Sequence, residues 1–274
     1  MKRTLQRAAL LLLITLSLTS RAEVEYRFGV VPQFEPRQLA AIWVPILHEL
    51  ERRTGLLLTM TGAPRIPDFE EDFRQGRFDF AYMNPYHSLM AAEAQGYEPL
   101  VRDGGRSLFG ILVVPRESPI RSLSELEGRQ VAFPAPNALG ASLLMRADLK
   151  ELHGVNIEPR YVKTHSSVYT NVLLGRVAAG GGVMGTLKRQ KPEVREALRI
   201  LYKTREMPTH PVVVHPRVPA EHREAVRRAL LEMGADERGA ALLAKVPIQR
   251  VVAASAEEYQ PLGEWGLERY VVDD

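Results

Sequence analysis

Short apolar segments alternate with amphipathic segments along almost the whole chain, and this alternation is what most restricts the fold. Apolar runs such as Tyr26–Val31, Leu56–Met60 and Phe78–Met83 have the length of strands. Between them, apolar residues recur at helical spacing, as over residues 39–50, a run that Gly55 ends. Repeated strand and helix units predict an α/β fold built on largely parallel sheets.

The first 22 residues have the composition of an export signal. Three basic residues lie within the first seven positions, an apolar run covers residues 8–18, and Ser20 and Ala22 place small side chains at the −3 and −1 positions of a cleavage site. We therefore expect cleavage after Ala22 and a periplasmic mature protein. The apolar run is shorter than the about 20 residues of a membrane span, and an uncleaved anchor is the alternative.

The mature chain is close to neutral. The full sequence of 274 residues has 36 Lys and Arg against 33 Asp and Glu, a net charge of +3. Four of the basic residues lie in the export signal, so removing it leaves 32 against 33 and a net charge of −1. A nucleic-acid partner is therefore not expected. The sequence has no cysteine, which excludes disulfides, a thiol nucleophile and Cys-ligated metal centres.

Two extended, proline-bounded segments predict two crossings between lobes, at Val113–Pro119 and at Thr204–Pro211. Two crossings divide the mature chain into a discontinuous first lobe, residues 23–113 and 212–274, and a continuous second lobe, residues 114–211. Such an arrangement forms a hinge, which suits closure around a ligand.

The sequence lacks the common catalytic and nucleotide-binding motifs. It has no P-loop, no His-Glu-x-x-His helix and no Gly-x-Ser-x-Gly elbow. Residues 180–185 match Gly-x-Gly-x-x-Gly, but a helical run precedes them where a dinucleotide site needs a strand, so close backbone packing is the simpler explanation. His210 and His215 have no carboxylate beside them, and we expect neither a metal site nor a cofactor. An exported hydrolase is an alternative that rests on the α/β architecture alone.

Ligands of open α/β sheets lie at the carboxyl ends of strands, and four loops occupy such positions. The loops are Pro32–Pro36, Tyr82–Pro85, Pro134–Gly140 and Lys163–Val168. Three of them offer donors for an anion as hydroxyl, amide, imidazole or main-chain N–H groups, and a plain helix cap is the alternative at each. The predicted ligand-binding residues are Tyr82, Asn84, Asn137, Ala138, Leu139, Gly140, His165 and Ser166.

In order and spacing, these segments resemble the periplasmic phosphonate/phosphite/phosphate-binding proteins of ABC transporters. The resemblance covers nearly all of the mature chain. It runs through Phe28–Pro32, Trp43 with Pro45, Gly76–Tyr82, Asn84-Pro85, Phe109–Pro115, Ser122–Gly128, Val131–Phe133, His165 with Gly175, and Met207-Pro208. The resemblance implies the type II periplasmic-binding fold, an α/β fold of two lobes with a hinge of two crossover segments, closing on a tetrahedral oxyanion.

The family resemblance also assigns roles to positions of this chain. A tyrosine at the end of the third strand typically contacts the anion, and Tyr82 matches it; a histidine at a helix start contributes as well, and His165 matches it. The Ser-rich turn of the family corresponds to residues 137–141, where asparagine, alanine and leucine replace hydroxyl side chains. Ala178 replaces the acid that usually ends a Gly-x-Val-Asp stretch. Each lost charge-assisted hydrogen bond weakens anion binding by roughly 1.5–3 kcal/mol.

The sequence therefore predicts a solute-binding protein and not an enzyme. It would close on a phosphonate/phosphite/phosphate-like oxyanion, or another small organic anion, and deliver it as a monomer to an inner-membrane ABC permease. If His165 is charged when it binds the anion, affinity falls as pH rises. The alternative is a periplasmic sensing module that partners a membrane histidine kinase or cyclase, with altered ligand specificity.

Overall fold

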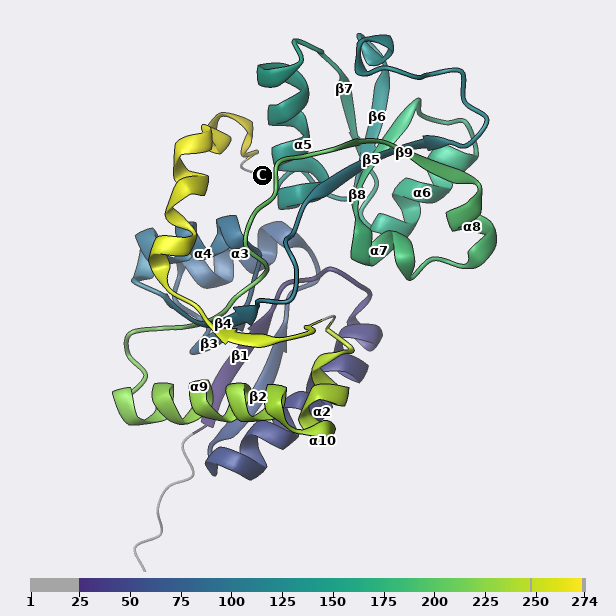
Figure 1. Cartoon of the computed structure of the whole chain (residues 1–274). Helices are drawn as coiled ribbons and strands as arrows, with labels where there is room; N and C mark the ends of the chain where they lie inside the picture. Colours follow the sequence, from purple (N-terminus) through teal and green to yellow (C-terminus); the bar gives the residue numbers. More distant parts are fainter. Residues whose placement is uncertain (1–24, 247, 273–274) are drawn as a thin grey trace, which may run out of the picture.

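The chain forms two α/β lobes joined by two crossing segments, as Figure 1 shows. The computed structural model describes residues 25–246 and 248–272, and the predicted export signal lies outside them. Each lobe contains one sheet, with six strands in the first lobe and five in the second. Within the described ranges, no helix combines the length and the apolar character that crossing a membrane requires.

The first lobe has the strand order β11-β4-β10-β3-β1-β2. Its strands are β1 (Glu25–Val30), β2 (Leu57–Gly62), β3 (Phe80–Tyr82), β4 (Glu98–Asp103), β10 (Val212–Val214) and β11 (Val251–Ala253). Its helices are α2 (Pro36–Thr54), α3 (Ile66–Arg74), α4 (Pro85–Gln95), α9 (Ala220–Ala235) and α10 (Glu237–Leu243). A buried apolar cluster fills the space between this sheet and its helices.

The second lobe has the strand order β7-β6-β8-β5-β9. Its strands are β5 (Gly110–Pro115), β6 (Gln130–Phe133), β7 (Glu158–Tyr161), β8 (Ala179–Val183) and β9 (Leu198–Lys203). Its helical segments are η1 (Leu123–Leu126), the continuous run η2 (Leu139–Leu143), α5 (Leu144–Ala147) and η3 (Asp148–Leu152), then α6 (His165–Leu173), α7 (Met184–Lys188) and α8 (Pro192–Glu196). Separate apolar clusters lie on the two faces of this sheet.

Both sheets are mixed, so the prediction of largely parallel sheets is wrong. β1 is parallel to β2 and β3, and β6 is parallel to β7 and β8. The strands that enter each lobe from the other, β5 and β10, are antiparallel to both of their neighbours. The reason is topological: a strand that arrives from the other lobe begins at the edge where the parallel strands end, and it must run the opposite way.

The crossings lie at residues 104–109, between β4 and β5, and at residues 204–211, between β9 and β10. The first comes before the predicted Val113–Pro119, because β5 already pairs with β8 and β9 in the second sheet. The crossings also pair with each other. Leu108 and Met207 form an antiparallel bridge whose two N–O distances are 2.9 and 2.8 Å. The connection between the lobes is therefore two-stranded.

The C-terminal segment contacts both lobes, although residues 212–274 were expected in the first. It contains η4 (Ala256–Glu258), η5 (Gln260–Trp265) and η6 (Leu267–Tyr270). η5 packs against α4 of the first lobe and η6 against α5 of the second. Leu262 and Leu267 are buried in an apolar cluster with Leu139 and Leu143. Figure 1 shows this segment, in yellow, rising along the side of the molecule from one lobe to the other.

Glycines on two strands of the second sheet allow a close approach of other backbone. A Cβ atom at Gly181 of β8 would lie 2.0 Å from the carbonyl oxygen of Ala141, and one at Gly110 of β5 would lie 1.8 Å from the carbonyl oxygen of Gly140. The first four residues of the Gly-x-Gly-x-x-Gly match lie in β8, which packs tightly against η2, and the last two begin α7. This packing fixes the start of η2 against the sheet.

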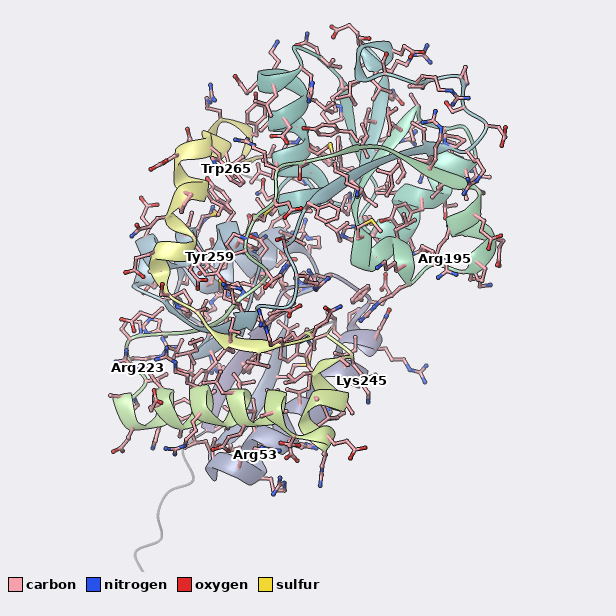
Figure 2. The ribbon with its side chains drawn as sticks, viewed as in Figure 1. Arg53, Arg195, Arg223, Lys245, Tyr259 and Trp265 are labelled. Carbon is pink, nitrogen blue, oxygen red and sulfur yellow. The ribbon has the colours of Figure 1, made fainter. Side chains whose placement is uncertain are left out.

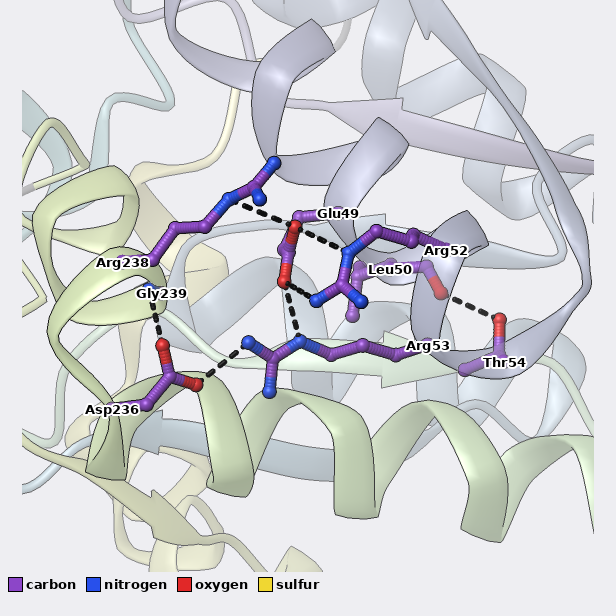
Figure 3. Close-up of polar contacts among 8 residues, drawn as sticks. All are labelled: Glu49, Leu50, Arg52, Arg53, Thr54, Asp236, Arg238 and Gly239. Carbon is purple, nitrogen blue, oxygen red and sulfur yellow. Dashed lines mark hydrogen bonds and ion pairs between the residues drawn. The ribbon is translucent and has the colours of Figure 1, made fainter.

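A buried carboxylate connects α2 to the helices at the end of the first lobe (Figure 3). Glu49 is only 2% exposed and accepts hydrogen bonds from Arg52 and Arg53, and Arg238 lies 3.3 Å from it. Arg53 also binds Asp236 at 2.6 Å, the residue that caps α10. The hydrogen bond from Arg52, with help from the other guanidinium groups, lowers the pKa of Glu49 to about 2.

Replacing Glu49 with glutamine is expected to lower the free energy of unfolding by about 2 kcal/mol at pH 7. The reason is that three guanidinium groups lose the negative charge of the carboxylate that lies between them. The loss should shrink at pH 3: this carboxylate stabilises the fold above its ordinary pKa of 4.5, and the stabilisation fades as pH falls toward about 2. Urea unfolding at both pH values measures the effect. Glu224→Gln, on the exposed face of α9, is the control and should stay within about 0.5 kcal/mol. An equal loss at both pH values for Glu49→Gln would contradict the assignment.

Candidate functional site

A cavity of about 560 Å³ lies between the lobes. Its walls come from the segments that follow β1, β2 and β3 in the first lobe and β6 and β7 in the second. The cavity therefore lies at the carboxyl ends of parallel strands from both sheets, where α/β proteins bind ligands. Its volume lies within the roughly 300–1,000 Å³ of small-molecule sites.

Most of the cavity wall is apolar and stiff. Phe34, Ile66, Leu139 and Val183 contribute side chains to it. Six prolines also line it: Pro32, Pro36, Pro64, Pro67, Pro134 and Pro136. Proline has no N–H group and a fixed φ angle, so these loops offer a rigid surface with few donors. A ligand that fits this wall needs an apolar part.

The start of α6 brings three polar side chains to the cavity. Thr164 caps the helix, and its hydroxyl oxygen accepts from the N–H of Ser167 at 3.1 Å. Lys163, directly before it, has a φ of 74°, a conformation that no other non-glycine residue adopts in the described part of the chain. His165 is the first helical residue, and its Nδ1 lies 3.3 Å from the hydroxyl oxygen of Thr186. Lys163, Thr164 and His165 all line the cavity.

The start of η2 adds main-chain donors. The first backbone hydrogen bonds of this helical run are made by the N–H groups of Ser142 and Leu143, which both donate to the carbonyl of Ala138. The N–H groups of residues 139–141 come before these bonds, and no described backbone oxygen accepts from them. Residues 139–141 line the cavity, so its wall carries N–H groups at the positive end of a helical segment.

Two histidines of the cavity are neutral at physiological pH. Burial lowers the pKa of His165 to about 4. Burial, together with the nearby guanidinium of Arg106, lowers the pKa of His210 to about 3. The Nε2 of His210 lies 2.7 Å from the amide nitrogen of Gln33, and its ring stacks on Tyr82 with centroids 5.3 Å apart. A charged His165, as the sequence suggested, does not fit this burial.

The structure brings most of the predicted residues to one place. Asn84, Ala138, Leu139, Gly140 and His165 line the cavity. Tyr82 lines a smaller recess that adjoins it. Asn84 also caps α4, because its side-chain oxygen accepts from the N–H of His87 at 2.7 Å.

Asn137 faces the contact between the lobes and does not line the cavity, so its predicted position in the site is wrong. Its Nδ2 donates to Glu70 Oε2 and to the carbonyl of Val272, both at 3.0 Å, and its Oδ1 accepts from the N–H of Val272 at 3.0 Å. Glu70 also binds the buried His87 at 2.9 Å. The amide is satisfied within the protein and connects three segments that are far apart in the sequence.

Ser166 also lies away from the cavity. It is exposed, and its hydroxyl oxygen accepts from the side chain of Gln190 at 3.2 Å. Consecutive helical residues point about 100° apart, so a helix start that presents His165 to the cavity turns Ser166 away from it.

The sequence did not predict several cavity residues, among them Lys163, Gln33, Tyr161 and His210. Gln33 lies in a loop that the strand-end rule singled out, but no residue there was chosen. Tyr161 ends β7, whose four residues are all exposed and give no apolar signal. His210 lies in a crossing segment and was considered only as a metal ligand. Within residues 25–246 and 248–272, no group of three or more His, Asp or Glu side chains is placed to hold a metal ion.

Asn137→Ala is expected to lower the free energy of unfolding by about 2–3 kcal/mol. The reason is that the buried carboxylate of Glu70 and the main-chain N–H and carbonyl groups of Val272 lose the amide that binds them. Asn137→Asp should be worse, since it places a second carboxylate against Glu70. Urea unfolding measures both. The matched control is Asn156→Ala, an exposed asparagine that also binds a glutamate, Glu127 at 3.0 Å, and should lose clearly less. Equal losses at positions 137 and 156 would contradict the assigned role.

Comparison with known proteins agrees with this architecture. The sequence model of the family described as "ABC transporter, phosphonate, periplasmic substrate-binding protein" matches residues 28–259. The phosphonates-binding periplasmic protein of Escherichia coli (strain K12) is 19% identical over 268 residues, which cover 89% of this chain and 77% of that protein.

Solved structures share the fold. The binding protein component of an ABC phosphonate transporter from Pseudomonas aeruginosa has a TM-score of 0.80 at 18% identity, covering 90% of this chain and 88% of that one. PhnD1 from Prochlorococcus marinus (MIT 9301), solved in complex with methylphosphonate, has a TM-score of 0.81 at 14% identity, covering 89% and 98%. Because the family match spans most of the sequence, this chain belongs to the family of periplasmic substrate-binding proteins of phosphonate ABC transporters.

Proposed function

We propose that this protein binds a small phosphorus oxyanion with an apolar substituent between its lobes and presents it to an inner-membrane ABC permease. One observation carries the proposal: an interlobe cavity with apolar walls holds a group of anion donors at two helix starts of the second lobe. Binding without catalysis, a monomeric state and export after cleavage at Ala22 are parts of the same proposal.

The oxyanion is held at the second lobe. The N–H groups of residues 139–141 point from the start of η2, Lys163 adds a positive charge, and His165 adds a neutral ring nitrogen. Donors at a helix start attract anions through the free N–H groups and the helix dipole. Closure of the lobes over the anion removes solvent from the cavity, which strengthens these hydrogen bonds.

The apolar substituent contacts the first lobe. Phe34 lies in the loop after β1, and Ile66 begins α3, which follows β2; both lie opposite the donors of the second lobe. A ligand that contacts both lobes stabilises the closed arrangement by its differential affinity for that state. The family model and the Pseudomonas aeruginosa structure are described as transport components, and none of the four descriptions supports the alternative of a sensing module.

The proposal predicts that methylphosphonate and ethylphosphonate stabilise the mature protein, residues 23–274, against heat. A ligand at 100 times its Kd adds about 2.7 kcal/mol to the free energy of unfolding. Lys163→Gln should weaken binding about tenfold, as the loss of one charge-assisted contact implies. Lys191→Gln, an exposed lysine elsewhere in the second lobe, is the matched control. No stabilisation by any phosphorus oxyanion, or equal effects of the two variants, would refute the proposal.

The affinity for ethylphosphonate should change less than about threefold between pH 6 and pH 8.5, after correction for the ionisation of the ligand itself. The reason is that burial keeps His165 neutral in this range, since its pKa is lowered to about 4. Isothermal titration calorimetry at several pH values measures the dependence. A steady fall in affinity as pH rises, abolished by His165→Asn, would show instead that the bound anion charges this histidine.

A further inference from the structure

A small recess of about 50 Å³ adjoins the cavity between the lobes. The two spaces share Gln33, Phe34, Leu108, Val183 and His210 in their walls. Beyond these shared residues, three basic side chains line the recess: Arg106, Arg189 and Lys245. None of the residues that line the recess is acidic. Lys245, labelled in Figure 2, follows α10 in the first lobe, on the side that faces the second lobe.

The two guanidinium groups come from different parts of the molecule. Arg106 belongs to the first crossing, is about one-third exposed and pairs with Asp103 at 2.8 Å. Arg189 follows α7 in the second lobe and reaches across the cleft, because its guanidinium lies 4.9 Å from the ring centroid of Phe34 and donates to the carbonyl of Lys245. No acidic side chain among the described residues pairs with Arg189.

The guanidinium groups of Arg106 and Arg189 lie close enough to repel each other. Partial burial lowers the pKa of Arg189, and the positive charge of Arg106 lowers it further. Like charges that approach as the lobes close repel each other, whereas an anion between them attracts both. Asp103 balances the charge of Arg106, whereas Arg189 and Lys245 have no acidic partner among the described residues, so the recess is positively charged.

A fixed hydroxyl completes the recess. Tyr82 is only 5% exposed, and its ring is held between Trp43, with centroids 4.8 Å apart, and His210. Tyr82 lines the recess, and no hydrogen bond joins its hydroxyl to another described residue. Burial raises the pKa of this hydroxyl, so it remains a donor. An anionic group in the recess can therefore accept a hydrogen bond from this hydroxyl.

We propose that this recess binds a second acidic group of the ligand, so that the preferred ligand is a phosphonate with a carboxylate at its other end. The inference rests on the proposed function, because it assumes that the phosphonate group lies at the donors of the second lobe. Arg106 and Arg189 then bind the carboxylate from both sides of the cleft, with the hydroxyl of Tyr82 as a third donor. The apolar wall between the two ends contacts the carbon chain that joins them.

The test compares ligands that differ only in this group. Phosphonoacetate and 3-phosphonopropionate are titrated calorimetrically into the mature protein, together with their carboxamide analogues and with ethylphosphonate. The free acids should bind at least tenfold more tightly than the carboxamides, since one charge-assisted contact corresponds to roughly this factor or more. The carboxamides keep the length and shape of the ligand, so the difference reports on the charge.

One variant locates the effect in the recess. Arg189→Gln should weaken binding of the tighter phosphonocarboxylate about 10-fold to 100-fold, and should change binding of ethylphosphonate less than threefold. Arg189 is exposed, so the variant should fold. Arg195→Gln, an exposed arginine on α8 at the outer side of the second lobe (Figure 2), is the matched control and should change neither.

The outcomes separate the inference from the function on which it rests. If ethylphosphonate and the phosphonocarboxylates all fail to bind, the proposed function is wrong. If ethylphosphonate binds as tightly as the phosphonocarboxylates, or if Arg189→Gln weakens both ligands equally, the second subsite is wrong while the proposed function stands.

Discussion

The direction of the strands that cross between the lobes determines most of this structure. The chain leaves the first sheet and enters the second at the edges where the parallel strands of each sheet end. β5 and β10 therefore run antiparallel to their neighbours, and the carboxyl ends of β1, β2, β3, β6 and β7 all face the space between the lobes. The cavity is a consequence of this topology, and the pairing of Leu108 with Met207 fixes it at the narrow connection.

Close backbone packing then decides which donors the cavity contains. Gly110 and Gly181 lack a Cβ atom, so the start of η2 can lie directly on the second sheet with its first N–H groups at the cavity wall. The side chains that a hydroxyl-rich turn would place there are absent, and the main chain, Lys163 and His165 remain. At the other end, Arg106 and Arg189 add charge where the wall is otherwise apolar. The two groups of donors together suit a ligand with two separate acidic groups, because a ligand with one oxyanion leaves one group of donors unoccupied.

The sequence predicted the fold well because the strands and helices of the cores carry a strong apolar pattern. It missed β4 and β7, since charged or exposed residues interrupt the pattern in both, and it missed the three-residue strand β11, where it expected helix. It placed the first crossing too late, because the apolar run of β5 gives no sign of which sheet it joins. Such information depends on pairing with β8 and β9, which lie far away in the sequence.

The site was predicted only in part, for a related reason. Strand-end loops are visible in a sequence, and most of the residues chosen there do lie at the cavity. The direction of a side chain is not visible: Asn137 turns toward Glu70 and Val272, which are 67 and 135 positions away. Arg189 could not have been chosen either, because only the packing of the two lobes brings it opposite Phe34.

Closure of the lobes on an anion is the central claim, and the distance between the lobes measures it directly. The chain has no cysteine, so Arg195→Cys on α8 and Glu224→Cys on α9 allow specific labelling of each lobe with a fluorescent dye. We expect ethylphosphonate to raise the mean efficiency of energy transfer between the dyes, with a midpoint at the calorimetric Kd. Saturable binding that leaves the transfer efficiency unchanged would contradict closure around the ligand.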